Sequence, residues 1–528
     1  MSQSHSADQV SQAPTRPPSA GASDAAEFDV ADLYRDASAV TASEASTSAH
    51  DEKLRQAYFW VVNHGIISPF YDIEYNDAPA QSYSFGDQKV RVTLPSEQSY
   101  SSYVLLPLLN LALRRRCLLV GGPGRGKTVI AKLMGILSGY SLTEIRQGIQ
   151  HGQPQMTVAD LLGNPIPSTL MSAETMDEVR IAWRKWLSMR IKIIDEYNRI
   201  PTRTQSALLT VMADNYAEIY DQVYECPEAA WYLTANDDAG GGTYQVIEAL
   251  SDRIDVVVKA LHFNTRFLDD LVLRIEEGVR PETMVPEEII FTEAEFEEMS
   301  RQIRKVKLPR KLRRRFEFFA SHFEFFEPGA RQFEYMTKDT VKLTDIELQS
   351  LAGGDSGKDG VADLGSQTRN GLSVRALMTC IAFMKGMAYF RGEDTVSYED
   401  MRQILPFVLH DKLVQEPDSP YFEQTNHGAL RTDKVSWIRT LLDLSSQEFE
   451  RLNLDADDPV GAFEIEFEKG LEDVSAREVR KRMVAIERVL KKWSDGGKLY
   501  GHMFDDILKL KYLHQRYTNY LRWLEWKT

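Results

Sequence analysis

A glycine-rich stretch that ends in Lys127 and Thr128 has the residue types needed to hold a phosphate chain. It matches the spacing Gly-x-x-x-x-Gly-Lys-[Ser/Thr], with a short apolar run before it and an apolar helical pattern after it. Glycines let successive backbone N–H groups curl around phosphate. Lys127 can then reach the β- and γ-phosphates, and the Thr128 hydroxyl can bind Mg²⁺. A chance match is disfavoured by the flanking strand and helix patterns. The expected nucleotide-binding residues here are Gly121, Gly122, Pro123, Gly124, Arg125, Gly126, Lys127, Thr128 and Val129.

Two adjacent acids follow a later apolar strand pattern. The run Ile191 to Ile194 predicts a buried strand, and Asp195 and Glu196 come directly after it. At the carboxyl end of such a strand, Asp195 would join Thr128 in holding Mg²⁺, partly through water. Glu196 would polarise the water that attacks the γ-phosphate. The alternative is a solvated strand end, but the glycine-rich stretch lies upstream at a distance typical of a β-α-β unit.

Two residues farther along could complete this chemistry. The apolar run Trp231 to Thr234 ends close to Asn236, whose amide would lie beside the γ-phosphate. Arg253 comes just before a largely β-branched run. An arginine in that position pairs by default with an acid of its own subunit, so position alone does not assign it to catalysis.

The composition is that of an ordinary globular chain. Its 528 residues, 43% apolar and 27% charged, allow about three or four domains. The longest apolar stretch, Val104 to Leu113, contains Pro107 and Asn110 and is too short to span a bilayer. The polar N-terminus lacks a signal core, and three cysteines without metal-type spacing suggest reduced thiols. We therefore expect a cytoplasmic protein without a membrane span.

The net charge of −16 argues against nucleic acid as a partner for the whole molecule. A basic run from Arg304 to Arg315, followed by several phenylalanines, is a local exception. The phenylalanines recur at helical spacing, which indicates a core stripe. The basic side chains then indicate a solvated face or a surface between subunits. Nucleic acid binding by this run is the disfavoured alternative.

The segment Asp195 to Leu209 carries a longer and more specific match. It resembles the signature Asp-Glu-x-Asn-Arg-x-Pro-x-x-Thr-Gln-x-Ala-Leu-Leu of the MoxR-type AAA+ ATPases. The tripeptide that ends in Asn236 resembles the sensor-1 strand tip of that family, and Gly242-Thr243-Tyr244 resembles the sequence after it. Arg253 stands at the family's offset for the arginine finger. The resemblance therefore implies that Arg253 acts on the nucleotide of a neighbouring subunit.

The segment Gly371 to Ala376 is similar to the sensor-2 motif at the start of a lid helix. Ser373 is a suitable N-cap, and the resemblance implies that Arg375 contacts phosphate. A surface arginine is the alternative, although an arginine at a helix N-terminus is unfavourable without an anion beside it. The chain departs from the family at Asp237, where a proline is usual, and at the flexible glycine run 240–242.

The resemblance covers residues from about 100 to 415 and implies an α/β fold. It comprises a P-loop AAA+ core with a parallel sheet, an α-helical lid and an additional C-terminal helical domain. The last helix, Met503 to Trp526, has an apolar stripe that either packs in a bundle or docks a partner. The expected divisions are a disordered tail at 1–53, a nucleotide-binding core at 54–262, a lid at 263–413 with an inserted mobile loop at about 327–370, and the helical domain at 414–528.

The resemblance also implies a function. The chain would hydrolyse ATP with Mg²⁺ in a homo-oligomeric ring, most simply a hexamer, and remodel a client protein. That client would be a maturing metalloenzyme or a von Willebrand A-domain protein. The catalytic residues would be Glu196, Asn236, Arg253 and Arg375. Two rivals remain: a nucleic-acid-stimulated or GTP-driven AAA+ motor of a restriction or defence system, and a scaffold that only binds nucleotide. The full catalytic set argues against the scaffold.

Overall fold

The computed structural model describes residues 50–76, 81–86, 90–175, 178–236, 252–344, 346–351, 363–424, 427–472 and 474–527. Several expectations lie outside these residues. They are the N-terminal tail up to residue 49, Asp237, the glycine run 240–242 with the tripeptide after it, and residues 352–362 of the inserted loop. Among the helices of the described ranges, none combines the length and the apolar content needed to cross a bilayer.

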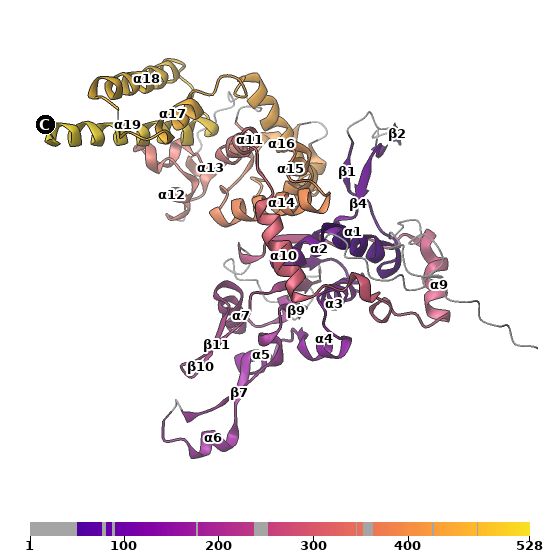
Figure 1. The fold of residues 1–528 in the computed structure, drawn as a ribbon. Helices are drawn as coiled ribbons and strands as arrows, with labels where there is room; N and C mark the ends of the chain where they lie inside the picture. Colours follow the sequence, from indigo (N-terminus) through magenta and orange to yellow (C-terminus); the bar gives the residue numbers. More distant parts are fainter. Residues whose placement is uncertain are drawn as a thin grey trace, which may run out of the picture. The chain divides into compact units, whose positions relative to one another are not determined.

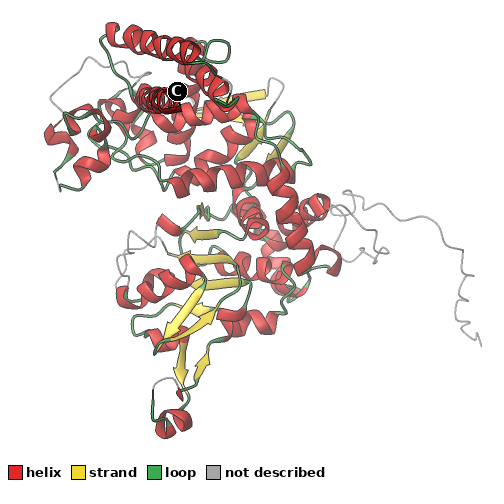
Figure 2. Cartoon of the chain, turned by 60° about the vertical axis from the view of Figure 1, so that its left-hand side comes forward, coloured by secondary structure: helices red, strands yellow, loops and turns green. Residues whose placement is uncertain are grey.

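Five parallel strands form the centre of the fold (Figure 2). β12 (Ala230–Ala235) lies between β5 (Arg116–Val120) and β9 (Ile191–Asp195), while β13 (Val256–Lys259) and β6 (Gln150–His151) form the two edges. β5, β9, β12 and β13 are largely apolar, as expected for a parallel sheet covered on both faces, whereas the edge strand β6 is polar. The strand order brings the carboxyl ends of β5, β12 and β9 side by side. The predicted strands at all three places are confirmed.

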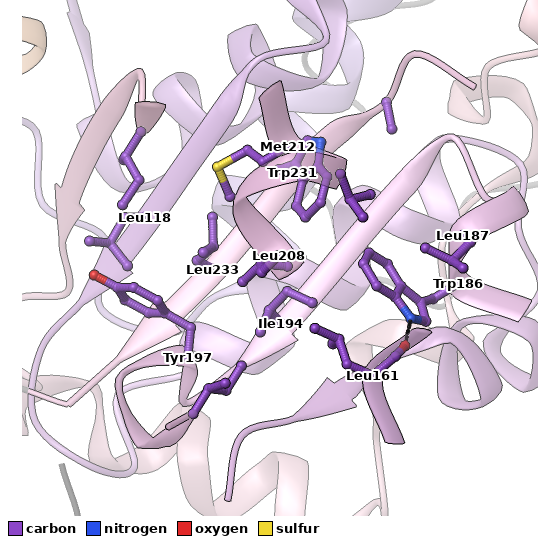
Figure 3. Packing of buried hydrophobic residues seen from close by; sticks show 14 of the residues in the cluster. Leu118, Leu161, Trp186, Leu187, Ile194, Tyr197, Leu208, Met212, Trp231 and Leu233 are labelled. Carbon is purple, nitrogen blue, oxygen red and sulfur yellow. Dashed lines mark hydrogen bonds between the residues drawn. The ribbon is translucent and has the colours of Figure 1, made fainter. Parts of the chain in front are cut away.

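A buried cluster ties β9 and β12 to the helices beside them (Figure 3). The rings of Trp186 and Trp231 meet edge to face, with centroids 5.8 Å apart. The Trp186 indole N–H donates to the Leu161 carbonyl at 2.6 Å. Lys192 on β9 is also buried; burial lowers its pKa to about 8, and its ammonium donates to nearby carbonyls, including that of Leu187 at 2.9 Å. This packing fixes the strand that ends in the acidic pair.

The core helices cover the sheet and lead into short hairpins (Figure 1). α2 packs against β5, β12 and β13, and Asn110 on α2 donates to the Trp231 carbonyl at 3.1 Å. After Asn215 the chain forms an antiparallel hairpin of β10 (Tyr216–Ile219) and β11 (Gln222–Glu225). The other core elements are α1 (His50–Trp60) with a π-helical turn at Val61–Gly65, β1 (Ile73–Tyr75), β2 (Gln81–Phe85), β3 (Val90–Leu94), β4 (Gln98–Tyr100), α2 (Ser102–Leu113), α3 (Lys127–Leu137), α4 (Leu142–Gly148), α5 (Val158–Leu162), β7 (Gly163–Pro165), α6 (Pro167–Ser172), β8 (Ile181–Trp183) and α7 (Thr202–Asp214).

The next segment is helical, and its caps follow from the sequence. Thr292 forms a capping box with Glu295, and the Ser373 side chain accepts from the backbone N–H of Ala376. The helices are α9 (Leu268–Glu276), α10 (Glu293–Lys305), α11 (Arg310–Ser321), α12 (Lys338–Lys342), α13 (Leu348–Leu351), α14 (Val374–Phe390) and α15 (Tyr398–Leu409).

Part of the inserted loop expected at about 327–370 is helical. Residues 338–342 form α12, and Lys338 at its start is buried. Its ammonium donates at 2.7 Å to the carbonyls of Gly365 and Thr368 and to the Thr368 hydroxyl. The loop expectation is therefore wrong for this part, because a buried lysine satisfied by carbonyls anchors it to the chain that follows.

Four helices follow: α16 (Lys434–Arg451), α17 (Pro459–Glu468), α18 (Ala476–Asp495) and α19 (Gly501–Lys527). The last three pack together around an apolar cluster that includes Leu513 and Tyr517 of α19. The stripe predicted on this helix is thus core packing at these two residues. Tyr520 and Leu521 also pack against the cluster, whereas Tyr512 is 52% and Trp526 85% exposed.

Two arginines at the end of the basic run pair with acids in or beside these last helices. Arg314 on α11 contacts Asp458 and Asp506, each at 2.9 Å, and Arg315 contacts Glu450 at 3.2 Å. Neither a solvated face nor a nucleic acid surface describes these two arginines. The charges of α11 instead attach it to the C-terminal helices, a contact between residues more than 100 positions apart that no local pattern reveals.

Two buried histidines at this junction predict a loss of stability in acid. His322 and His502 have ring centroids 5.1 Å apart, and burial lowers the pKa of His502 to about 4. The unfolded chain, with a histidine pKa of about 6.5, therefore takes up protons first as the pH falls. Neutral His502 therefore contributes fully to the free energy of unfolding above about pH 6.5. At pH 5 this free energy should be lower by roughly 2 kcal/mol. The measurement is the urea midpoint of unfolding at pH 7 and pH 5.

A His502→Phe variant tests this origin because it keeps an aromatic ring but removes the titration. Its urea midpoint should fall less between pH 7 and pH 5 than that of the parent. His514→Gln, in which a histidine paired with Glu487 on the surface of α19 is replaced, is the control and should behave like the parent. Equal pH dependence in all three proteins would contradict the prediction.

Candidate functional site

The glycine-rich stretch forms the turn between β5 and α3. Gly124 and Gly126 have φ values of 73° and 78°, in the region that favours glycine. A side chain at Gly121, where φ is 145°, would lie 2.9 Å from the Ala260 carbonyl oxygen. α3 begins at Lys127, so the free N–H groups of its first turn adjoin the loop. Such a loop before a helix N-terminus suits a phosphate group.

Lys127 lies folded against the loop that it follows. Its side chain is 7% exposed, and its ammonium donates to the carbonyls of Gly121 at 2.6 Å and Gly122 at 2.8 Å. A third bond, 2.9 Å long, goes to the side-chain oxygen of Asn236 at the tip of β12. The cation and the amide are therefore held together where a terminal phosphate would lie.

Oxygen donors suited to Mg²⁺ meet beside Lys127. The hydroxyls of Thr128 and Thr234 both donate to one carboxylate oxygen of Asp195, at 2.9 and 2.6 Å. The other oxygen of Asp195 lies 3.3 Å from Nδ1 of His151. Carboxylate and hydroxyl oxygens are hard ligands, and Mg²⁺ typically takes only one or two from a protein while phosphates and waters supply the rest. The chemistry of Thr128 and Asp195 fits this ion.

Glu196 is held in an unusual backbone conformation. Its φ of 52° lies in the left-handed region, which costs a non-glycine residue roughly 1–2 kcal/mol. Its carboxylate accepts from the Asn236 amide at 2.9 Å and lies 3.2 Å from Arg199, and its N–H donates to the Thr234 hydroxyl at 2.9 Å. A strained backbone conformation that three hydrogen-bond or ion-pair partners stabilise is typical of a carboxylate at a functional site.

Sequence reasoning missed three residues around this acid pair. Thr234 bonds both acids, and a signal was available because it lies two residues before Asn236, on the same face of the strand. Gly152 on the β6 side donates to the Asp195 carbonyl at 2.7 Å, and a methyl group there would overlap the Glu196 carbonyl oxygen. His151, the third, carries no local signal, because only the pairing of β6 with β9 brings it close.

A largely apolar cavity of about 430 Å³ opens beside the phosphate loop. It is lined by Gly124, Arg125, Gly126 and Val129, by residues 65–72 and 101–103 before β5, and by residues 260–281 after β13. Arg274 on α9 donates to the carbonyls of His64 and Ile66, which fixes one wall. An apolar pocket with a few placed polar groups suits a nucleoside.

Arg253 and Arg375 lie away from this network. Arg253 precedes Val256, which pairs with Cys117, whereas the phosphate loop follows Val120 at the other end of the same strand. In a parallel pair this puts Arg253 roughly 15 Å or more from its own loop. Arg375 at the start of α14 pairs with Asp252, and Lys412 donates to the Asp252 carbonyl at 3.3 Å. The structure thus groups Lys127, Thr128, Asp195, Glu196 and Asn236 at the carboxyl ends of the strands. It brings Arg375 close to Arg253 near the amino ends.

Parts of this chain are similar to known protein families and proteins. Residues 116–256 match the model of the ATPase family associated with various cellular activities (AAA), and residues 365–427 match the AAA lid domain. Chaperone MoxR1 of Mycobacterium tuberculosis is 25% identical over 314 residues, which are 59% of this chain and 71% of that protein. A solved structure from Cytophaga hutchinsonii is 17% identical with a TM-score of 0.47, covering 72% of this chain and 94% of that one.

Proposed function

Because this chain is a MoxR-type AAA+ ATPase, we propose that it hydrolyses Mg·ATP in a ring of copies and uses the resulting motion to remodel a protein partner in the cytoplasm. One observation carries the proposal. The phosphate loop, both acids and Asn236 form one hydrogen-bonded network, while Arg253 and Arg375 lie near the opposite ends of the strands.

The network divides the chemistry among its residues. Lys127 would exchange the loop carbonyls for the β- and γ-phosphate oxygens of ATP, and Thr128 with Asp195 would hold Mg²⁺, whose charge would offset that of the phosphates. Glu196 orients and polarises the attacking water from its fixed backbone position. Asn236 joins Lys127 to Glu196, so it senses phosphate at one end and positions the carboxylate at the other.

The position of the two arginines supports a ring. Arg253 cannot reach its own triphosphate across the length of the sheet, but in a head-to-tail assembly it meets the nucleotide of the next copy. Arg375 would then serve the same neighbouring site, with phosphate replacing Asp252 as its anionic partner. An arginine at this place stabilises charge that develops on the γ-phosphoryl group. Six copies in the ring is the family expectation.

Exposed apolar tips offer contacts for a protein partner. Met171 on α6 is 90% exposed, and Leu170 beside it 47%. Tyr220 at the turn of the β10–β11 hairpin is 49% exposed, and Val223 54%. Large apolar side chains in solvent typically mark interaction sites. A von Willebrand A-domain protein remains one expected partner, and the relative named as a chaperone supports a protein client.

ATPase turnover measured against protein concentration tests the proposal. Turnover per subunit should rise as copies assemble and should be nearly absent where sedimentation shows only monomer, because each site then lacks Arg253 of a neighbour. Full turnover in a strictly monomeric protein would overturn the ring. Strong stimulation by DNA or RNA, or a preference for GTP, would favour the motor alternative instead.

A further inference from the structure

The hairpin of β2 and β3 (the β2–β3 ribbon, residues 81–85 and 90–94) carries an apolar face in solvent. Its register pairs Tyr83 with Val92 and Phe85 with Val90, and Leu94 pairs with Gln81 on the same face. These five large side chains are exposed by 46 to 59%. Within the described residues the two strands form a sheet only with each other.

The opposite face of the ribbon is polar. Ser82 pairs with Thr93, their hydroxyls 3.0 Å apart, and Ser84 pairs with Arg91. The ribbon therefore has the alternation of a strand pair that packs on a surface with one face and meets water with the other. A two-stranded hairpin alone is marginally stable in water, so the apolar face calls for a partner.

The β1–β4 ladder at the base of the ribbon adjoins the cavity beside the phosphate loop. The chain enters and leaves it through the β1–β4 ladder, and Asp72 before β1 accepts from the N–H and hydroxyl of Ser102 after β4, at 2.8 and 2.7 Å. Both residues line the cavity beside the phosphate loop. The next residue, Tyr103, donates to the Arg125 carbonyl at 3.1 Å. The ladder thus runs from the cavity at one end to the ribbon at the other.

We propose that the apolar face of the β2–β3 ribbon packs against the next copy of this chain in the ring, on the face that carries Arg253. This inference rests on the proposed function, because the cavity at the base of the ribbon lies on the subunit boundary only if a neighbour completes the site. The ribbon would extend the contact between the two copies beyond the nucleotide site. Its five side chains offer on the order of 400 Å² of apolar surface, about half of what one partner buries in a stable interface. The ribbon would therefore add to the subunit interface formed at the nucleotide site rather than form an interface alone.

The receiving face has a matching apolar pair. Val374 and Met378, one turn apart on α14, are 73% and 55% exposed. They lie in the same part of α14 as Arg375, which pairs with Asp252, the residue before Arg253. Two different patches on the two sides of one chain form the kind of heterologous contact that closes a ring.

The test compares the two faces of the same ribbon. Tyr83→Thr, Val92→Thr and Leu94→Thr in one protein remove apolar surface but keep residues that favour strands. The control carries Ser82→Thr, Ser84→Thr and Thr93→Ser on the polar face. Sedimentation should show that the apolar-face variant needs at least tenfold more protein for half-assembly, while the control matches the parent. Nucleotide affinity should be unchanged in both, and high protein concentration should restore turnover in the variant.

Each outcome decides something different. If the parent assembles and the apolar-face variant assembles equally well, the inference is overturned while the proposed function stands; loss of client remodelling alone would assign the ribbon to the client. If the parent itself stays monomeric and active, the proposed function fails first. A second protein with Val374→Gln and Met378→Gln should also assemble less readily. Unchanged assembly there would overturn the receiving face.

Discussion

A Glu196→Gln protein is expected to bind Mg·ATP and to assemble like the parent while hydrolysing ATP at least about 100-fold more slowly. Glutamine keeps the size of the side chain and an oxygen that can accept from Asn236, so the network around Lys127 should survive. It loses the negative charge that polarises the attacking water and pairs with Arg199. Phosphate release, measured with nucleotide affinity on the same preparation, separates turnover from binding.

The matched control for this variant is Glu297→Gln, the same chemical change at an exposed position on α10. It should leave nucleotide affinity and turnover at the parent values. Parent-like turnover in Glu196→Gln would show that another group activates the water, and the assignment of the base would be wrong.

For Arg253→Ala we expect parent-like nucleotide affinity and a loss of turnover on the order of 10³-fold. The affinity should persist because the residues that hold nucleotide lie at the other end of the strands, with their own contacts intact. The loss should be large because Arg253 would place its positive charge at the γ-phosphoryl group, where negative charge develops. Arg266→Ala, which removes an exposed arginine between β13 and α9, is the control and should change neither quantity.

Mixed rings decide whether Arg253 acts across the boundary. A Lys127→Ala subunit lacks its own phosphate contact but still offers Arg253, whereas an Arg253→Ala subunit offers the reverse. At equal amounts and random assembly, roughly a quarter of the boundaries combine both intact halves. Turnover should therefore recover to about that share of the parent value. Verified mixed assembly without recovery would contradict action in trans.

The local chemistry was predictable because it depends on residues close together in sequence. The phosphate loop, the acidic pair after β9 and the cap at Ser373 each follow from a strand end or a helix start that apolar periodicity marks. The strand assignments around the site are confirmed, and with them the α/β class. The α10 capping box was predictable for the same reason, since its two partners lie three residues apart.

The tertiary structure alone decided what depends on strand order and on long-range pairing. Placing β12 between β5 and β9 joins Asn236 to Lys127 and Glu196, while the parallel pairing of β13 with β5 puts Arg253 at the opposite end of the strands. The pairing of α11 with distant acids likewise depends on segments far apart in the chain. The exposure of the apolar face of the β2–β3 ribbon also depends on how the rest of the chain packs. Sequence periodicity reports which face of an element is apolar, but only the packed fold determines what that face meets.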